Sequence, residues 1–333
     1  MRPTSILFLL FICIQSIFAQ TIYDYEQKIK LSKDQSALEI KFTNQEDGVE
    51  LSGTLIYPKK EFKKVIIIVP GSGRDTRHAH FVLAKEFLAN GIAVYRFDER
   101  GIGSSDGKYN YTATSLESDV IAAFKQLKKT EFLLHKKIGI LGHSLGGIAS
   151  IGALGKGCEF DYLIQMATPV ENNGAFIEYQ VSTNIDGFYT VKNKTSAEVI
   201  HFVNILRKSV DPIDDYKTTK RKSKVILKQL DFRKGKHIVN PLIVDLMKQN
   251  HEATYQNSSV PILYIIGTAD RIVSSENETF ILNNLDNPLV TVKLIGEMNH
   301  WLNEKIAPTK MSKSLYSMAA AAQLEIINWT LDQ

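Results

Sequence analysis

The chain has 333 residues, of which 44% are hydrophobic, and it carries a formal net charge of +4. This length and apolar content suffice for a large buried core, while so modest a charge selects no class of partner. One of the two cysteines, Cys13, lies in an apolar N-terminal segment, so only Cys158 would remain after removal of that segment. An intramolecular disulfide is then excluded.

Residues 1–19 have the pattern of a secretory signal peptide. Arg2 precedes an apolar run over 6–14, and the small residue Ala19 offers a cleavage point. The run is shorter than the ~20 apolar residues that a bilayer-spanning helix needs. We therefore expect an exported protein, periplasmic or secreted, with no stable membrane insertion after cleavage. An uncleaved anchor is the alternative.

Apolar strands and helical patterns alternate through the first half of the chain. The expected elements are an antiparallel hairpin of edge strands at 37–42 and 48–57, strand 64–69, helix 81–89, strand 92–97, helix 115–129, strand 137–141, a helix directly after residue 144, and strand 162–166. Continuous apolar strands that alternate with helices are typical of a parallel sheet covered on both faces. The sequence thus predicts an α/β fold with a mostly parallel central sheet.

The alternation stops at about residue 170 and resumes at about 256. The intervening chain is polar, with a helical stretch at 197–210 and a basic segment at 217–236. Strands at 261–266 and 290–295 and a helix at 316–331 then follow. We interpret 20–333 as one domain with a helical cap inserted at about 170–256.

The run of basic residues at 217–224 is interpreted as a solvated face of this cap, although an anionic surface or substrate would also suit it. Nucleic-acid binding would require interleaved aromatic side chains, which the run lacks, so no nucleic-acid partner is expected.

The motif at 142–146 is the strongest functional signal. Ser144 stands in a Gly-x-Ser-x-Gly pattern between a predicted strand and a predicted helix, which is the context of a nucleophile elbow. A sharp strand-to-helix turn leaves no room for a Cβ at Gly142 and Gly146. Ser144 is therefore the candidate nucleophile.

A serine nucleophile needs a general base and a group that orients the base. Asp270 follows the strand at 262–266, and His300 follows the strand at 290–295, in the chain order serine, acid, histidine. Glu171, after the strand at 162–166, is a second candidate for the acid. His143 is interpreted as structural, because adjacent residues on a tight turn point apart.

Two backbone N–H groups should stabilise the oxyanion that forms during acyl transfer. We expect these from Leu145, which follows the nucleophile, and from Ser72 in the glycine-containing loop after the strand at 64–69. The sequence has no metal-ligand spacing and no complete dinucleotide-binding motif, so neither a metal nor a cofactor is expected.

The segments 71–73, 98–105, 142–147, 267–270 and 298–300 together resemble the α/β-hydrolase superfamily. Within it they are most similar to the bacterial esterase, dienelactone-hydrolase-like and serine-aminopeptidase-like branch. The resemblance implies the α/β-hydrolase fold, with helices on both faces of the sheet and an inserted helical cap. It also implies structural roles for Asp98, Arg100, Gly101 and Gly103. Pro70 departs from the family pattern, which has a histidine there.

The expected activity is hydrolysis of carboxylic esters through an acyl-enzyme intermediate, with a small-molecule ester as substrate. A serine peptidase acting on short peptides is the alternative, since a carboxylate in the cap could bind a peptide amine. The acidic candidates for that role are Glu171, Glu178, Asp186, Asp211, Asp214 and Asp215. A catalytically inactive binding module is the third hypothesis, against which the complete set of Ser144, Asp270 and His300 argues.

Overall fold

The computed structural model describes residues 23–109, 112–184, 186–304 and 313–333. The predicted signal peptide and its cleavage point at Ala19 lie outside the described residues. Within the described ranges, no helix has both the length and the apolar character needed to cross a bilayer.

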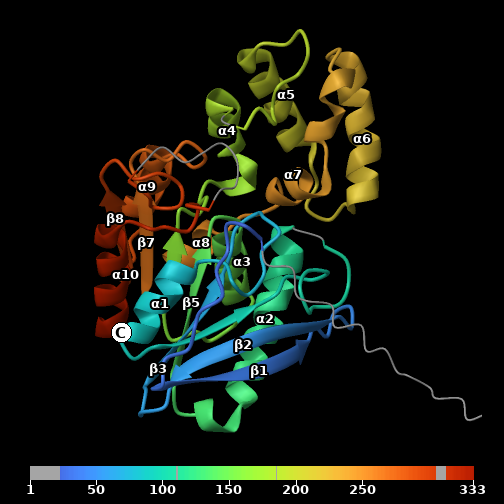
Figure 1. The fold of residues 1–333 in the computed structure, drawn as a ribbon. Coiled ribbons are helices and arrows are strands. Elements are labelled where there is room, and N and C mark those ends of the chain that lie inside the picture. Colours follow the sequence, from blue (N-terminus) through green and yellow to red (C-terminus); the bar gives the residue numbers. More distant parts are fainter. Residues whose placement is uncertain (1–22, 110–111, 185, 305–312) are drawn as a thin grey trace, which may run out of the picture.

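The described chain contains a sheet of eight strands in the order β1-β2-β4-β3-β5-β6-β7-β8. Their bounds are β1 Gln35–Thr43, β2 Glu50–Pro58, β3 Lys64–Val69, β4 Ala93–Phe97, β5 Lys137–His143, β6 Leu163–Met166, β7 Ile262–Gly267 and β8 Val290–Ile295. From β4 to β8 all neighbouring strands pair in parallel, and only β2 runs antiparallel to both of its neighbours. The predicted α/β-hydrolase fold is confirmed (Figure 1).

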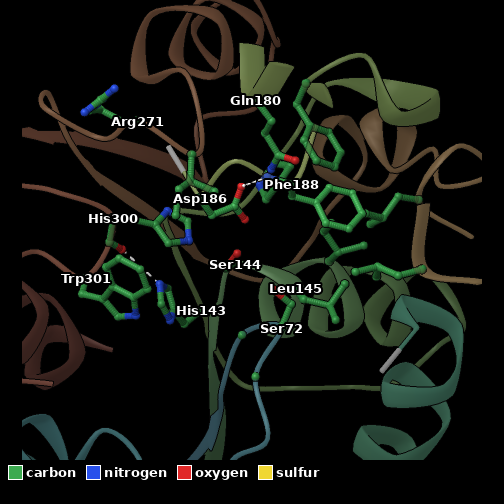
Figure 2. A pocket seen from close by; sticks show the side chains of 18 of the residues that line it. Ser72, His143, Ser144, Leu145, Gln180, Asp186, Phe188, Arg271, His300 and Trp301 are labelled. Atoms are coloured by element: carbon green, nitrogen blue, oxygen red, sulfur yellow. Dashed lines mark hydrogen bonds between the residues drawn. The ribbon is translucent and has the colours of Figure 1, made fainter. Parts of the chain in front are cut away.

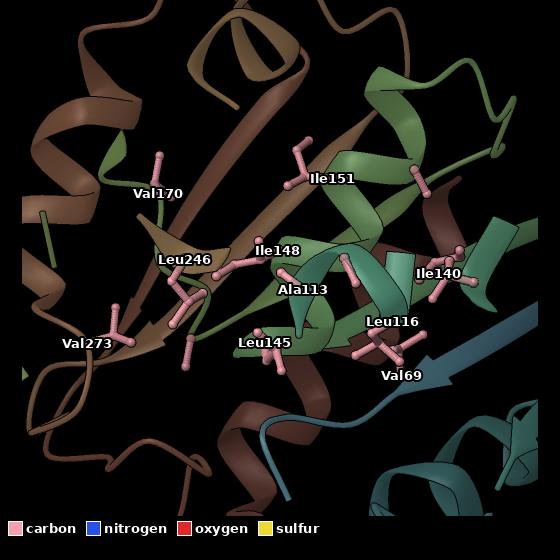
Figure 3. Packing of buried hydrophobic residues seen from close by; sticks show 14 of the residues in the cluster. Val69, Ala113, Leu116, Ile140, Leu145, Ile148, Ile151, Val170, Leu246 and Val273 are labelled. Atoms are coloured by element: carbon pink, nitrogen blue, oxygen red, sulfur yellow. The ribbon is translucent and has the colours of Figure 1, made fainter. Parts of the chain in front are cut away.

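Helices cover both faces of the sheet because its central strands are apolar on both sides. The covering helices are α1 Phe81–Ala89, α2 Ala113–Lys129, α3 Leu145–Gly155, α9 Ser275–Asn283 and α10 Ala320–Asp332. In β3, Val65 and Ile67 belong to the core cluster that contains α2 and α3, whereas Ile66 and Ile68 belong to the cluster that contains α1 and α10. This alternation is the two-residue period of a strand. Figure 3 shows part of the first cluster, to which Leu116 of α2 and Val69 of β3 both belong.

The N-terminal hairpin corrects one expectation. β1 and β2 pair antiparallel as predicted, but β2 is not an edge strand, because its other side pairs with β4. Leu51 and Leu55 of β2 are fully buried, which suits an interior strand. Gly53 of β2 leaves room for Tyr95 of β4, since a Cβ there would lie 2.3 Å from the tyrosine oxygen. Only β1 therefore closes this side of the sheet.

The inserted segment forms a helical cap beyond the carboxyl ends of the strands (Figure 1). Its helices are α4 Ile177–Thr183, α5 Ser196–Ser209, α6 Tyr216–Gln229 and α7 Pro241–Leu246. Phe202 of α5 stacks on Phe232 with ring centroids 4.7 Å apart, which gives the cap an apolar centre. The following helix, α8 Glu252–Gln256, returns to the sheet, because its buried Tyr255 donates a hydrogen bond to Gln165 of β6 at 3.1 Å. The cap helices that stand away from the sheet thus end with α7.

Candidate active site

The nucleophile elbow is a strained turn at the end of β5. Ser144 has φ 53° and ψ −117°, a backbone conformation that residues other than glycine rarely adopt. A Cβ on Gly142 would lie 2.4 Å from the carbonyl oxygen of Gly146, and a Cβ on Gly146 would lie 2.3 Å from that of Pro70. Both distances are far below van der Waals contact. The two glycines therefore allow the turn that presents Ser144 at the start of α3.

The acid and base candidates meet at the carboxyl ends of β7 and β8. His300 Nδ1 lies 2.8 Å from Asp270 Oδ2, and both side chains are buried. The other oxygen of Asp270 accepts the backbone N–H groups of Ile272 at 2.7 Å and Val273 at 2.9 Å. Because the carboxylate accepts hydrogen bonds, Nδ1 carries the proton and Nε2 of His300 is left as the basic nitrogen.

Ser144 and His300 line one cavity of about 360 Å³ between the sheet domain and the cap (Figure 2). Ile148 of α3 and several cap residues give part of the wall an apolar character. The apolar cap residues on the wall are Phe176, Phe188, Leu242, Ile243 and Leu246. The polar part of the wall contains Gln180, Asp186 and Arg271, which Figure 2 shows around the opening above Ser144. Such a mixed cavity suits a small molecule.

The candidate oxyanion donors flank the nucleophile. Leu145 is the first residue of α3, and N–H groups in the first turn of a helix have no intrahelical acceptor. The loop that holds Ser72 follows β3 and touches the elbow, since a Cβ on Gly71 would lie 3.3 Å from Cβ of Ser144. In that loop the N–H of Gly73 is bonded to the carbonyl of Gly71 at 2.9 Å. Leu145 and Ser72 both line the cavity.

The alternative acid does not contact His300. Glu171 accepts a hydrogen bond from Asn277 at 3.4 Å, while Asp270 holds the position beside the histidine. Asp98, for which the family resemblance implied a structural role, accepts the backbone N–H groups of Arg77 and Ser104, both at 2.8 Å. It is fully buried and also forms an ion pair with the Arg77 guanidinium. These contacts hold the loop after β4 in place against Arg77.

Arg100 likewise has a structural environment. It forms ion pairs with Asp119 of α2 and with Asp47 of the β1–β2 turn, both at 2.6 Å. Gly101 and Gly103 both have positive φ, and a Cβ on Gly103 would lie 2.4 Å from the Asp98 carboxylate.

The sequence alone did not reveal how His143 contacts the site. Its side chain is buried, and Nε2 lies 3.0 Å from the backbone carbonyl oxygen of His300, to which it donates a hydrogen bond. The two imidazole centroids are 4.8 Å apart (Figure 2). Burial, followed by the nearby His300 and His80, holds the pKa of His143 well below its ordinary value, so this imidazole stays neutral. His143, the residue directly before the candidate nucleophile, is thus hydrogen-bonded to the loop that carries the candidate base.

The fold and this arrangement define a hydrolase of the α/β-hydrolase superfamily, as the five sequence motifs predicted. The sequence profile of the family described as "Serine aminopeptidase, S33" matches residues 60–305, about three quarters of the chain. The protein therefore belongs to this family.

The solved structures that share the fold include the following three. The esterase Pf2001 of Pyrococcus furiosus is 16% identical, with a TM-score of 0.58 over 94% of this chain and 98% of its own. The α/β hydrolase GrgF of Penicillium sp. sh18 is 17% identical, with a TM-score of 0.57 over 89% of this chain and 97% of its own. Est1E of Butyrivibrio proteoclasticus, in a structure with ferulic acid bound, is 19% identical, with a TM-score of 0.54 over 86% and 96%.

Among curated proteins, an uncharacterized 31.7 kDa protein of Escherichia coli from the traX-finO intergenic region is 35% identical over 65 residues. That match spans 19% of this chain and 23% of the relative.

Proposed function

We propose that the protein is an exported serine hydrolase that cleaves carboxylic esters through an acyl-enzyme intermediate. Ser144 Oγ attacks the ester carbonyl while His300 Nε2 takes its proton, and Asp270 orients and stabilises the resulting imidazolium. The N–H groups of Leu145 and Ser72 stabilise the oxyanion. His300 then protonates the leaving alkoxide and activates the water that releases the acid. The observation that carries the proposal is the 2.8 Å contact between His300 and Asp270 beside a cavity that also contains Ser144.

The lining of the cavity supports an apolar acyl group. Ile148 of α3 and Leu242, Ile243 and Leu246 of the cap line the cavity together with Ser144. Burial of an apolar acyl chain against these side chains would contribute about 0.8 kcal/mol per methylene. We therefore expect esters of medium-length aliphatic or aromatic acids to be better substrates than acetate esters.

Fluorophosphonate labelling of the purified protein tests the nucleophile. We expect the label on Ser144 of the wild type and none on Ser144→Ala, while Ser182→Ala, a change at an exposed cap serine, keeps full labelling. A p-nitrophenyl ester series from acetate to decanoate then tests the acyl preference. A folded wild-type protein that takes up no label would refute the hydrolase mechanism and favour an inactive binding module.

Hydrolysis of short peptides is the second candidate, and Asp186 is the observation that favours it. This cap residue lines the cavity, and Figure 2 shows its carboxylate above Ser144. Its Oδ1 accepts the N–H of Phe188 at 2.8 Å, and the exposed carboxylate could pair with a peptide amine. Aminoacyl anilides compared with esters distinguish the two functions. If the protein is a peptidase, Asp186→Asn should lower kcat/KM for anilides at least tenfold and leave ester turnover unchanged.

Export is proposed from the pattern of residues 1–19 alone. N-terminal sequencing of the protein recovered from the extracytoplasmic fraction of its producing cells tests it. A mature chain that begins at Gln20 would support cleavage, whereas an intact Met1 would support the uncleaved anchor.

A further inference from the structure

Positive charge is concentrated in one segment of the cap. Residues 216–236 contain nine basic residues and one acidic residue, so they carry a charge of +8 while the rest of the chain carries −4. The nine basic residues are Lys217, Lys220, Arg221, Lys222, Lys224, Lys228, Arg233, Lys234 and Lys236. The net charge of +4 therefore conceals a local concentration of positive charge in α6 and the turn after it.

The basic side chains of α6 all point to solvent. Thr219, Ser223 and Leu227 form the buried side of the helix, whereas its five lysines and one arginine are exposed. Positions 217, 221, 224 and 228 follow one another at helical spacing and form a single stripe. At a rise of 1.5 Å per residue the stripe is about 16 Å long. Figure 1 shows that α6 lies on the outer side of the cap.

Only part of this charge is balanced within the described residues: Asp215, the N-cap of α6, interacts electrostatically with Lys217 and Arg221. Among the residues that the structure describes, Asp214 is the one carboxylate within ion-pair distance of a basic side chain of α6, and its partner is Lys222. Lys220 lies 5.3 Å above the ring of Tyr216. Like charges three or four residues apart destabilise a helix by a few tenths of a kcal/mol per pair. An anionic partner would relieve this repulsion.

Exposed aliphatic side chains accompany the charges. Ile213, in the turn before α6, is 90% exposed, and Val225 on α6 is 56% exposed. Bases of a nucleic acid would need aromatic side chains on which to stack, and the half-buried Tyr216 of α6 instead donates its hydroxyl to the carbonyl of Val239 at 3.2 Å. Cations combined with exposed aliphatic groups are the features of a helix that lies on a lipid surface.

We propose that the exposed face of α6 binds an anionic phospholipid surface. The lysine and arginine side chains contact the lipid phosphates, each strengthening binding about fivefold, and Ile213 and Val225 enter the headgroup region. α6 packs against α7, whose Leu242 and Leu246 line the cavity, so binding holds the cap beside the lipid.

Vesicle sedimentation tests the proposal on the chain from Gln20 onward, in a Ser144→Ala background. Because this background lacks the proposed nucleophile, the result does not depend on the proposed hydrolase activity. We expect at least tenfold tighter binding to vesicles with 30% phosphatidylglycerol than to pure phosphatidylcholine, and weaker binding in 300 mM than in 50 mM NaCl. Equal binding to both kinds of vesicle would overturn the proposal.

Matched variants locate the surface. The triple change Arg221→Glu, Lys224→Glu and Lys228→Glu should weaken binding to the anionic vesicles at least tenfold. The control, which carries Lys125→Glu, Lys128→Glu and Lys129→Glu on exposed positions of α2, makes the same change of charge and should bind within twofold of the parent. Thermal unfolding verifies that both variants are folded. An equal loss in the two variants would refute a specific role for α6.

A final pair of measurements separates lipid from other polyanions. The double change Ile213→Ser and Val225→Ser should weaken vesicle binding about tenfold and leave binding to a 30-base-pair DNA duplex unchanged. If the parent binds the duplex more tightly than the vesicles, or if the double change has no effect on vesicle binding, the lipid proposal is wrong.

Discussion

Replacement of Glu278 by glutamine should stabilise the protein increasingly as the pH rises. Glu278 lies on α9 and is fully buried. Its Oε2 accepts the backbone N–H groups of Val170 at 2.7 Å and Glu171 at 2.9 Å, in the segment that leads from β6 into the cap. Burial, followed by the charge of Glu171, raises the pKa of Glu278 from 4.5 to about 8. The folded protein thus keeps this carboxyl protonated at neutral pH.

The raised pKa of Glu278 determines the direction and the maximum size of the difference in stability between the variant and the wild type. A folded-state pKa above the unfolded value means that the folded state binds the proton more tightly, so this contribution to stability is complete below pH 4.5 and is lost as the pH rises through about 8. The loss is about 1.4 kcal/mol per pH unit, which gives a ceiling of about 5 kcal/mol. Glutamine has a carbonyl oxygen that can accept both N–H bonds and has no charge to lose. The variant should therefore match the wild type at pH 4.5 and exceed it by several kcal/mol at pH 8.

Urea unfolding of Glu278→Gln and the wild type at pH 4.5, 6, 7 and 8 measures this difference directly. Glu276→Gln, at an exposed position on the same helix, is the matched control and should follow the wild type at every pH. A constant difference between Glu278→Gln and the wild type across the range, or a variant less stable at pH 8, would refute the reasoning.

Substitutions at three further positions test the elbow and the residues around the candidate base. Gly146→Ala should lower the free energy of unfolding by several kcal/mol and prevent fluorophosphonate labelling, because the added Cβ would lie 2.3 Å from a backbone oxygen. Urea unfolding measures the loss of stability. The control is Gly296→Ala, since a Cβ at Gly296 would meet nothing within 4 Å. His143→Leu should lower kcat tenfold to a hundredfold, on the order of one lost buried hydrogen bond to the His300 carbonyl, with KM unchanged. In the same kinetic assay His143→Gln, whose amide can donate, should recover most of that activity, and equal activities of the two variants would contradict the role. Asp270→Asn should lower kcat for esters about 10³- to 10⁴-fold, because the amide favours the wrong tautomer of His300. Circular dichroism should show that the variant remains folded. A loss of kcat below tenfold would exclude Asp270 as the orienting group.

Local sequence patterns predicted the sheet well because each central strand carries its own signal. The run at 64–69 is apolar at almost every position, and a glycine on each side of Ser144 indicates a turn with no space for side chains. The interior place of β2 could not be predicted, since it depends on Gly53 making room for Tyr95, a residue far along the chain.

Long-range contacts within the candidate site could not be predicted from local sequence patterns either. The bond from His143 to His300 joins residues 157 positions apart, and nothing in the local sequence of either residue indicates it. The bonds from Glu278 to the start of the cap span more than 100 residues. Such contacts depend on which strands lie next to one another in the sheet, and that order follows from the packing of the whole domain.

The insertion of the cap between β6 and β7 has a consequence for how the enzyme is made. Synthesis proceeds from the N-terminus, so the elbow with Ser144 leaves the ribosome first, the cap follows, and Asp270 and His300 emerge last. β7 and β8 must then add to the open side of the sheet, beside β6, before the serine meets a base. Under the proposed mechanism, a nascent or prematurely terminated chain presents Ser144 without its proton acceptor, and activity requires that the loop after β8 is in place.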